Sequence, residues 1–145
     1  MIRMKQVHRI TVNCFMYPSE DEERVKKALS LITGKLPVKK EELNSYYGPE
    51  LFLLSCEAGK QAQVKQVLEN IELSMSEEDM QQFYDSIDER LDDEGVVHMR
   101  FDKQQAYDGK LVLGYSGDII KVQIRVAAYP FSREKALEAA KSLFE

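Results

Sequence analysis

Long apolar runs are missing from this sequence of 145 residues. No stretch approaches the ~18 consecutive apolar residues that a membrane-spanning helix needs, and residues 1–5 enter a strand pattern without the apolar core of a signal peptide. We therefore expect a cytoplasmic protein with no membrane partner. The length and the hydrophobic share of 43% suit one globular domain, residues 1–145, with a substantial core.

Cysteine is scarce, and the familiar catalytic motifs are absent. Cys14 and Cys56 lie in apolar, strand-like segments, which favours buried, reduced thiols over a disulfide. Together with His8 and His98 they lack the paired close spacing of a zinc site, so we expect no metal. The sequence has no P-loop, GxGxxG or GxSxG motif and no evident Ser/His/Asp arrangement. We therefore predict that the protein is not an enzyme and holds no cofactor.

Charge is unevenly distributed along the chain. The net charge is −5, but residues 74–95 contain nine acidic residues against Arg90 alone, so the rest of the chain has a net charge of +3. Residues 1–18 contain Arg3, Lys5 and Arg9 and no acid. The acidic residues lie in an amphipathic helical pattern, which is more typical of a solvated helix face than of a metal site. The overall acidity therefore does not exclude a nucleic-acid partner.

Five segments have the alternating apolar pattern of β-strands. They are residues 8–16, Leu51–Cys56, Val96–Asp102, Leu111–Tyr115 and Ile119–Tyr129. The Ser-Gly-Asp sequence between the last two predicts a hairpin turn. Residues 35–49 are predicted to form a loop, in which Tyr46 and Tyr47 could stack on bases, although loop tyrosines more often pack against their own domain.

Helical patterns separate these strands. The first predicted helix spans Ser19–Gly34 and begins with a capping box of Ser19 and Glu22. Two further helices are predicted from their apolar faces, which are Val64, Val67, Leu68 and Ile71 in one and Met80, Phe83, Tyr84, Ile87 and Leu91 in the next, which begins at a Ser76–Asp79 cap. The last predicted helix spans Ser132–Phe144. Strands and helices do not alternate strictly, as they would in a parallel sheet. The predicted fold class is therefore α+β, with an antiparallel or mixed sheet and helices packed on one of its faces.

Three predicted strands carry polar side chains opposite the core, because successive side chains of a strand point to opposite faces. These residues are Arg9, Thr11 and Asn13; His98 and Arg100; and Lys121, Gln123 and Arg125. They include four fixed cations and no carboxylate. If the strands share one sheet and this face is open to water, it is a basic platform that could hold a phosphate backbone. The alternative is that polar residues simply face solvent on a half-exposed antiparallel sheet.

The stretch RFDKQQAYDGKL, residues 100–111, interrupts the strand pattern. Asp102 is positioned to cap a short helix whose first turn contains Lys103 and Gln104. A helix N-terminus beside a lysine can bind an anion, so Lys103 and Gln104 at the rim of the basic face could meet phosphate or ribose. The spacing alone favours the alternative, a capped turn in which Asp102 takes the free N–H groups and the apolar residues pack on the core.

Four segments together resemble a known family in their order and spacing. They are HRITVNCFMYPSEDEERVKKAL (8–29), YYGPELFLL (46–54), MRFDKQQAYDGKLVL (99–113) and DIIKVQIRVAAYP (118–130). They are similar to archaeal RNA-binding-domain proteins that are described as predicted exosome-associated subunits. The resemblance covers nearly the whole chain, and its most specific parts are Pro-Ser-Glu-Asp at 18–21 and the Asp-Lys-Gln-x-Ala…Gly run at 102–109. It implies an archaeal source, an RNA ligand and an α+β fold similar to that of the ribosomal protein that binds 5S ribosomal RNA.

Two functions are consistent with these features. The first is a non-catalytic RNA-binding protein, an accessory of the exosome or of other RNA-processing proteins, that contacts structured or ribosomal-like RNA. The residues expected to bind RNA are Arg9, His98, Arg100, Lys103, Gln104, Lys121, Gln123 and Arg125. The second is a protein–protein interaction module or a homodimerising domain, indicated by the acidic stretch at 77–94 and by an aliphatic hairpin that could pair edge to edge. The acidic stretch would repel RNA unless it faces away from the sheet.

Overall fold

A single five-stranded sheet organises the part of the chain that the structure describes. The computed structural model describes residues 7–43, 51–114, 117–128 and 131–145. The strands are β1 (Val7–Met16), β2 (Lys39–Leu43), β3 (Leu51–Ala58), β4 (Val96–Asp102) and β5 (Ile119–Val126). Their order is β2-β3-β1-β5-β4, and every neighbouring pair is antiparallel. The first strand of the chain is therefore the central strand of the sheet.

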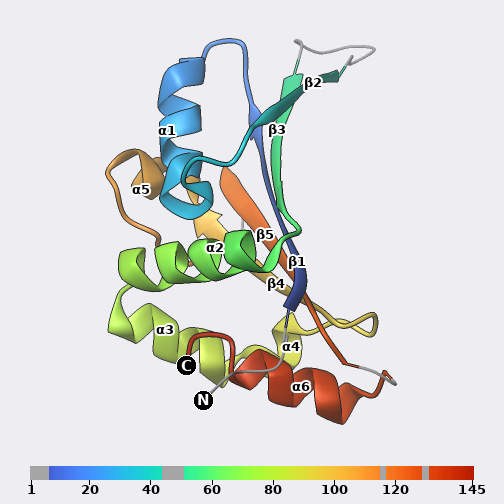
Figure 1. The fold of residues 1–145 in the computed structure, drawn as a ribbon. Helices are drawn as coiled ribbons and strands as arrows, with labels where there is room; N and C mark the ends of the chain where they lie inside the picture. The colour runs from blue at the N-terminus through green and yellow to red at the C-terminus, as the bar shows by residue number, and fades with distance from the viewer. Residues whose placement is uncertain (1–6, 44–50, 115–116, 129–130) are drawn as a thin grey trace.

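Helices cover one face of this sheet. They are α1 (Glu22–Thr33), α2 (Gln61–Ser74), α3 (Glu77–Asp85), α4 (Ile87–Arg90), α5 (Lys103–Tyr107) and α6 (Arg133–Lys141). Figure 1 shows α1, α2 and α5 against one face, with α3 and α6 continuing below α2 toward the end where β1 begins, while no helix of the described residues lies on the opposite face. The predicted α+β class is confirmed, and so is the prediction that helices pack on one face.

The core lies between the sheet and these helices. Alternate residues of β1, from Ile10 to Met16, are buried, and so are the predicted apolar stripes of α1 and α2: Val25, Ala28, Leu29, Ile32, Val64, Val67 and Ile71. The residues between them on β1 point to the open face, because side chains alternate along a strand. The strict apolar alternation of β1 therefore fixes which of its polar residues are presented to solvent.

The first helix begins later than predicted. Its N-cap is Asp21, whose carboxylate accepts the N–H of Glu23 at 3.0 Å, so the predicted capping box of Ser19 and Glu22 is wrong. A turn before the helix, closed by a hydrogen bond from Glu20 N–H to the carbonyl of Tyr17, delays the start of α1. The predicted end is confirmed, since Gly34 is the C-cap with a φ of 60°, a left-handed conformation that glycine adopts without strain.

Part of the predicted loop at 35–49 is an edge strand. Strand β2 pairs with β3, with Lys39 opposite Ser55 and Leu43 opposite Leu51. Its sequence, KKEEL, lacks the apolar alternation of a half-buried strand because most of its side chains are exposed. Charged edge strands of this kind resist pairing with other chains. Tyr46 and Tyr47 lie outside the described residues.

The helix predicted from Ser76 to Leu91 is divided at Ser86. Ser76 caps α3 as predicted, and Phe83, Ile87 and Leu91 are buried as predicted. At Ser86, however, the hydroxyl donates to the carbonyl of Gln82 at 2.7 Å, a local bond that competes with regular helical pairing. The chain therefore continues as the separate short helix α4.

The predicted hairpin near the C-terminus is wrong. Within residues 111–114 the structure has only isolated bridges, Met75 with Leu111 and Phe101 with Leu113, and Tyr115 lies outside the described residues. Strand β5 pairs instead with β1 on one side and β4 on the other. Because β5 is an interior strand, it offers no free edge to a partner.

Candidate nucleic-acid interface

The open sheet face collects side chains from three adjacent strands. Strand β5 lies between β1 and β4, and residues opposite each other in an antiparallel pair point to the same face. The rows across β1, β5 and β4 are Arg9–Arg125–Val96, Thr11–Gln123–His98 and Asn13–Lys121–Arg100. Six of the eight predicted residues, Arg9, His98, Arg100, Lys121, Gln123 and Arg125, thus share one face.

The cations of this face are accessible to solvent. Arg9, Arg100 and Arg125 are exposed, and Lys121 is half-buried between its neighbouring strands. Lys121 and Arg100 stand directly opposite each other. Within the described part of the chain, neither forms an ion pair. Like charges directly opposite each other on neighbouring strands repel, and no ion pair within the described residues offsets this repulsion.

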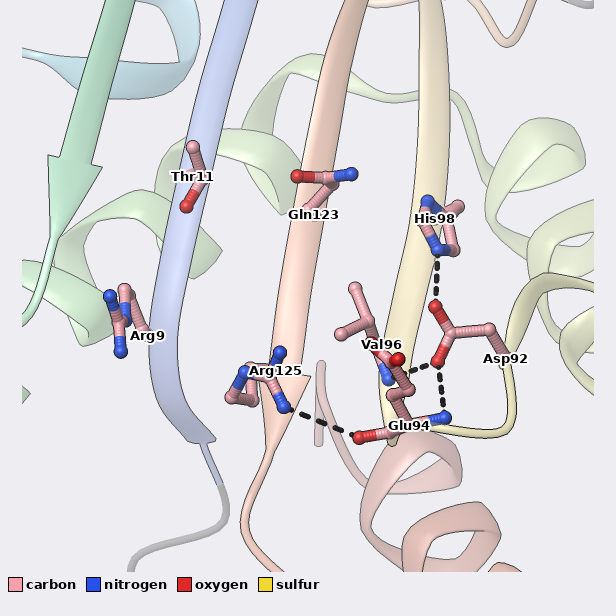
Figure 2. Close-up of a pocket in the computed structure, with 8 residues that line it drawn as sticks. All are labelled: Arg9, Thr11, Asp92, Glu94, Val96, His98, Gln123 and Arg125. Atoms are coloured by element: carbon pink, nitrogen blue, oxygen red, sulfur yellow. Dashed lines mark hydrogen bonds and ion pairs between the residues drawn. The ribbon is translucent and has the colours of Figure 1, made fainter.

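A hollow of about 340 Å³ lies at one end of the face. Figure 2 shows Arg9 and Thr11 on β1, Gln123 and Arg125 on β5, and His98 on β4 lining it. The segment between α4 and β4 adds Asp92 and Glu94 at the side of β4. Sequence patterns did not predict that these two acids lie at the basic face, because their position depends on the path of the chain around β4.

Asp92 is held rigidly by three donors. Its Oδ1 atom accepts the N–H groups of Glu94 at 2.8 Å and Val96 at 3.0 Å, and its Oδ2 atom lies 2.8 Å from His98 Nε2. Burial alone would raise the pKa of Asp92, but the hydrogen bonds from His98 and from the two backbone N–H groups outweigh it and lower the pKa. Asp92 is therefore ionised at neutral pH, and it orients the imidazole of His98 at the edge of the face.

The two arginines at the hollow have weak partners. Arg9 Nη1 lies 3.1 Å from Glu57 Oε1, and both side chains of this pair are more than half exposed. Arg125 Nη1 donates to the backbone carbonyl of Glu94 at 3.3 Å. Exposed ion pairs contribute about 0–1 kcal/mol, so a phosphate can replace Glu57 as the partner of Arg9 at little cost.

Lys103 lies elsewhere, and the prediction that it lies at the exposed rim is wrong. Its side chain is completely buried, with Nζ 2.7 Å from the carbonyl oxygen of Phe15, 2.7 Å from Glu20 Oε1 and 3.4 Å from Asp118 Oδ1. These three acceptors match the three N–H groups of a lysine ammonium. Lys103 therefore has no donor left for a ligand, and its role is to join α5 to the end of β1.

Gln104 is exposed but is separated from the other candidates. It lies on α5, which packs beside α1 in Figure 1, and its Nε2 donates to Asp118 Oδ2 at 3.2 Å. Asp102 accepts the N–H of Gln105 at 3.0 Å, which confirms the predicted cap. The capped turn is therefore the correct interpretation of this stretch, and of its residues predicted to bind RNA only Arg100 lies on the open face.

Two exposed aromatic residues were missed by the sequence interpretation. Phe15 continues the series Arg9, Thr11 and Asn13 on the open face of β1, and Tyr17 follows the strand. Each is 47% exposed, which is unusual for a large aromatic side chain. The period of the strand predicted the position of Phe15, but an apolar residue does not fit a search for polar side chains.

The described residues contain neither a cluster of metal-ligating side chains nor a membrane-spanning helix. There, no group of three or more His, Cys, Asp and Glu side chains is arranged to hold a metal ion. None of the helices described is long and apolar enough to cross a bilayer.

These features define a class of protein: an α+β domain whose open antiparallel sheet face presents basic and hydrogen-bonding side chains from adjacent strands. Comparison with known proteins is more specific. The chain belongs to the RNA-binding family, whose family model, described as RNA binding, matches residues 9–126. The predicted resemblance to an RNA-binding family is thereby confirmed.

Relatives from archaea match over nearly their whole length. RNA-binding protein PAB1135 of Pyrococcus abyssi is 29% identical over 97% of this chain and 95% of its own. The crystal structure of protein AF2318 from Archaeglobus fulgidus has a TM-score of 0.84 at 29% identity and covers 94% of this chain and 99% of its own. Mth689 from Methanothermobacter thermautotrophicus, a DUF54 protein, has a TM-score of 0.82 at 28% identity, over 97% and 100% of the two chains.

Proposed function

We propose that this protein binds RNA, without catalysing a reaction, through the open face of its sheet. The residues proposed to contact RNA are Arg9, His98, Arg100, Lys121, Gln123 and Arg125. Membership of the RNA-binding family and the name of the Pyrococcus abyssi relative support an RNA ligand. Lys103 is left out because it is buried, and Gln104 would serve only an RNA long enough to reach α5.

The observation that carries the proposal is the register of β1, β5 and β4. In this register Arg9 is opposite Arg125 and Lys121 is opposite Arg100, so four cations from three strands lie on one face, which none of the described helices covers. Phosphates of a nucleic-acid backbone can neutralise such a group and release their counterions. The polar groups between them, Thr11, Gln123 and Asn13, can hydrogen-bond phosphate, ribose or base edges.

Most of the acidic stretch at residues 77–94 is compatible with this proposal. The acids of α3 lie in the helical layer, away from the open face. Asp92 and Glu94 are the exceptions, since they line the hollow. They would repel a backbone at that end of the sheet, so we expect the path of the RNA to follow Lys121 and Arg100 more closely than Arg125.

A filter or mobility-shift titration with RNA oligonucleotides at low salt tests the proposal. Lys121→Glu and Arg100→Glu should each weaken binding on the order of tenfold, because each replaces a phosphate contact with a repulsion. Neutral variants, Lys121→Gln and Arg100→Gln, should each reduce the slope of log K against log salt by roughly 0.7 for a single strand.

Lys65→Glu on α2 is the matched control. Lys65 is exposed on a helix, and α2 covers the opposite side of the sheet. The same change of charge there should leave RNA affinity almost unchanged. If wild-type protein retains no RNA at low salt, or if Lys65→Glu weakens binding as much as Lys121→Glu, the proposal fails.

An accessory role beside the exosome, or beside other RNA-processing proteins, is the finer form of this proposal. It rests on the resemblance of residues 8–29, 46–54, 99–113 and 118–130 to proteins that are described as predicted exosome-associated subunits. Affinity capture from an archaeal extract with and without ribonuclease treatment tests it. Recovery of exosome subunits that survives ribonuclease would support a direct protein contact, and loss of every such subunit in both samples would contradict the role.

A protein-interaction function has one specific observation in its favour. Leu73 on α2 is 84% exposed, and together with Met75 and Met80 it lines a groove between α2 and α3 that also holds the acids Glu69, Glu72 and Glu77. An acidic groove with apolar residues suits a basic amphipathic partner. The native mass of the purified protein would show whether it forms a homodimer. If it does, Leu73→Glu should dissociate the dimer into monomers.

A further inference from the structure

The open face carries a basic row and, beside it, an exposed aromatic residue. The basic row, Asn13–Lys121–Arg100, runs across three strands. Two residues beyond Asn13 on β1 lies Phe15, on the same face by alternation and 47% exposed. Its partner on β3 is Leu53, which is half-buried, so one side of the phenyl ring has an apolar neighbour.

The distance between Phe15 and the basic row suits one nucleotide. Because Asn13 is opposite Lys121, Phe15 and Lys121 are diagonal neighbours, and such residues lie about 7–8 Å apart in an antiparallel pair, with their Cβ atoms somewhat closer. An aromatic ring and a lysine at this spacing can contact the base and the phosphate of the same nucleotide. Arg100 lies one strand further on and can meet the next phosphate.

The exposure of Phe15 has no explanation within the described fold. A phenyl ring that contributes to the core is buried, as Phe83 and Phe101 are here. Exposed aromatic rings beside cations on a sheet are the arrangement with which proteins stack unpaired bases, because every base has a π face. Bases inside a duplex are already stacked on each other and are not available to a flat sheet.

We propose that this face binds single-stranded RNA, with a base stacked on Phe15 and the adjoining backbone held by Lys121 and Arg100. This inference rests on the proposed function and narrows it to unpaired RNA. Single strands are chosen over duplex because a duplex could use the cations but not the phenyl ring. The charge of the basic row favours RNA over a protein partner for the same surface.

The first experiment compares Phe15 variants against matched single-stranded and duplex oligonucleotides of the same length. Phe15→Leu keeps an apolar side chain but removes the ring, so the Kd for single strands should rise on the order of tenfold, the usual effect of losing one base–aromatic stack. Phe15→Tyr keeps a ring and should bind like wild type. Phe131→Leu is the control, since Phe131 is 52% exposed but lies outside the sheet, in the segment before α6.

The second experiment detects stacking directly. The chain has no tryptophan, so Phe15→Trp introduces a single fluorophore at the proposed contact. Its emission should be quenched when single-stranded RNA binds and should be unchanged by tripolyphosphate, which offers phosphates without bases. Circular dichroism and the thermal midpoint show that each variant is folded.

The outcomes separate this inference from the proposed function. If RNA binding depends on Lys121 and Arg100 but Phe15→Leu binds single strands as wild type does, the proposed function stands and the stacking inference is overturned. Equal affinity for duplex and single strands also overturns it. If Phe15→Leu changes the oligomeric state in size-exclusion chromatography and leaves RNA binding intact, Phe15 contacts a second copy instead. Absence of any RNA binding overturns both proposals.

Discussion

Lys103 Nζ donates a hydrogen bond of 2.7 Å to Glu20 Oε1, although the two residues are 83 positions apart in the chain. The other oxygen of Glu20 accepts the hydroxyl of Tyr107 at 2.5 Å, and Oε1 also accepts the backbone N–H of Tyr17 at 3.0 Å. Lys103 and Tyr107 belong to α5, whereas Glu20 precedes α1. This buried cluster therefore fixes α5 against the end of β1 and the start of α1.

Replacement of Lys103 by methionine should destabilise the fold. The change keeps most of the apolar stem but leaves Glu20 and Asp118 without their cation, and breaking a buried ion pair costs about 3–5 kcal/mol. Because Glu20 and Asp118 keep side-chain exposures of 16% and 31%, water can partly solvate them and the loss should fall at the lower end of that range. Urea denaturation would measure it as a lower midpoint at an unchanged m-value.

Lys110→Met serves as the control for this change. Lys110 is exposed close to the end of α5, and an exposed substitution usually alters stability by less than about 0.5 kcal/mol. RNA affinity of Lys103→Met, measured where the variant is folded, should equal that of the wild type. A loss of affinity without a loss of stability would contradict a purely structural role for Lys103.

Acid should weaken the same cluster. Burial alone would raise the pKa of Glu20, but the hydrogen bonds from Lys103, Tyr107 and the Tyr17 N–H outweigh it and lower the pKa from its ordinary value of 4.5. A carboxyl group with a lowered pKa in the folded state stabilises the fold above its unfolded pKa, and this contribution is lost as pH falls through the folded pKa.

Stability measured from pH 7 to below pH 4.5 by denaturant titration should therefore fall less steeply for Glu20→Gln than for wild type, because glutamine cannot take up the proton. At neutral pH the variant should be the less stable of the two. Parallel pH curves for the two proteins would contradict the assignment of this titration to Glu20.

The sequence predicted the sheet face well because alternation is a local property. Once Ile10, Val12 and Cys14 are assigned to the core, Arg9, Thr11 and Asn13 must face the other way. Alternation along the later strand likewise predicted that Lys121, Gln123 and Arg125 point away from the core, to the same sheet face as Arg9. Which strands are neighbours could not be read in this way, and the predicted hairpin of residues 111–129 was wrong because β5 pairs with strands distant in sequence.

The error at Lys103 had a signal that could have corrected it. Ala106 lies three residues later on the same short helix, and both residues are buried. Residues at i and i+3 of a helix share a face, so packing of Ala106 on the core already places Lys103 inward. The acceptors that make such burial tolerable, Glu20 and Asp118, are distant in sequence and could not be assigned to Lys103 before the fold was known.

Both cysteine thiols should resist alkylation in the folded protein. Cys14 and Cys56 are free and buried, as the sequence indicated. Burial raises the pKa of Cys14 from 9.0 to about 12, with the charges around it having smaller effects, and burial also raises the pKa of Cys56. Because the thiolate is the reactive form, iodoacetamide at pH 8 should modify neither residue until denaturant is added, as mass spectrometry would show. Rapid modification of Cys14 without denaturant would show that β1 opens locally.

Removal of the charge of Glu57 should strengthen RNA binding. Glu57 holds Arg9 at 3.1 Å in an exposed pair, so Glu57→Gln should change the free energy of unfolding by less than about 1 kcal/mol while freeing Arg9 for phosphate. The Kd for RNA at low salt should fall a few-fold, and the gain should shrink as salt screens the added cation. Glu69→Gln, an equal change of charge at an exposed position of α2, is the control and should leave the Kd unchanged. Equal gains from both variants would mean that net charge, and not the position of Arg9 on the open face, determines affinity.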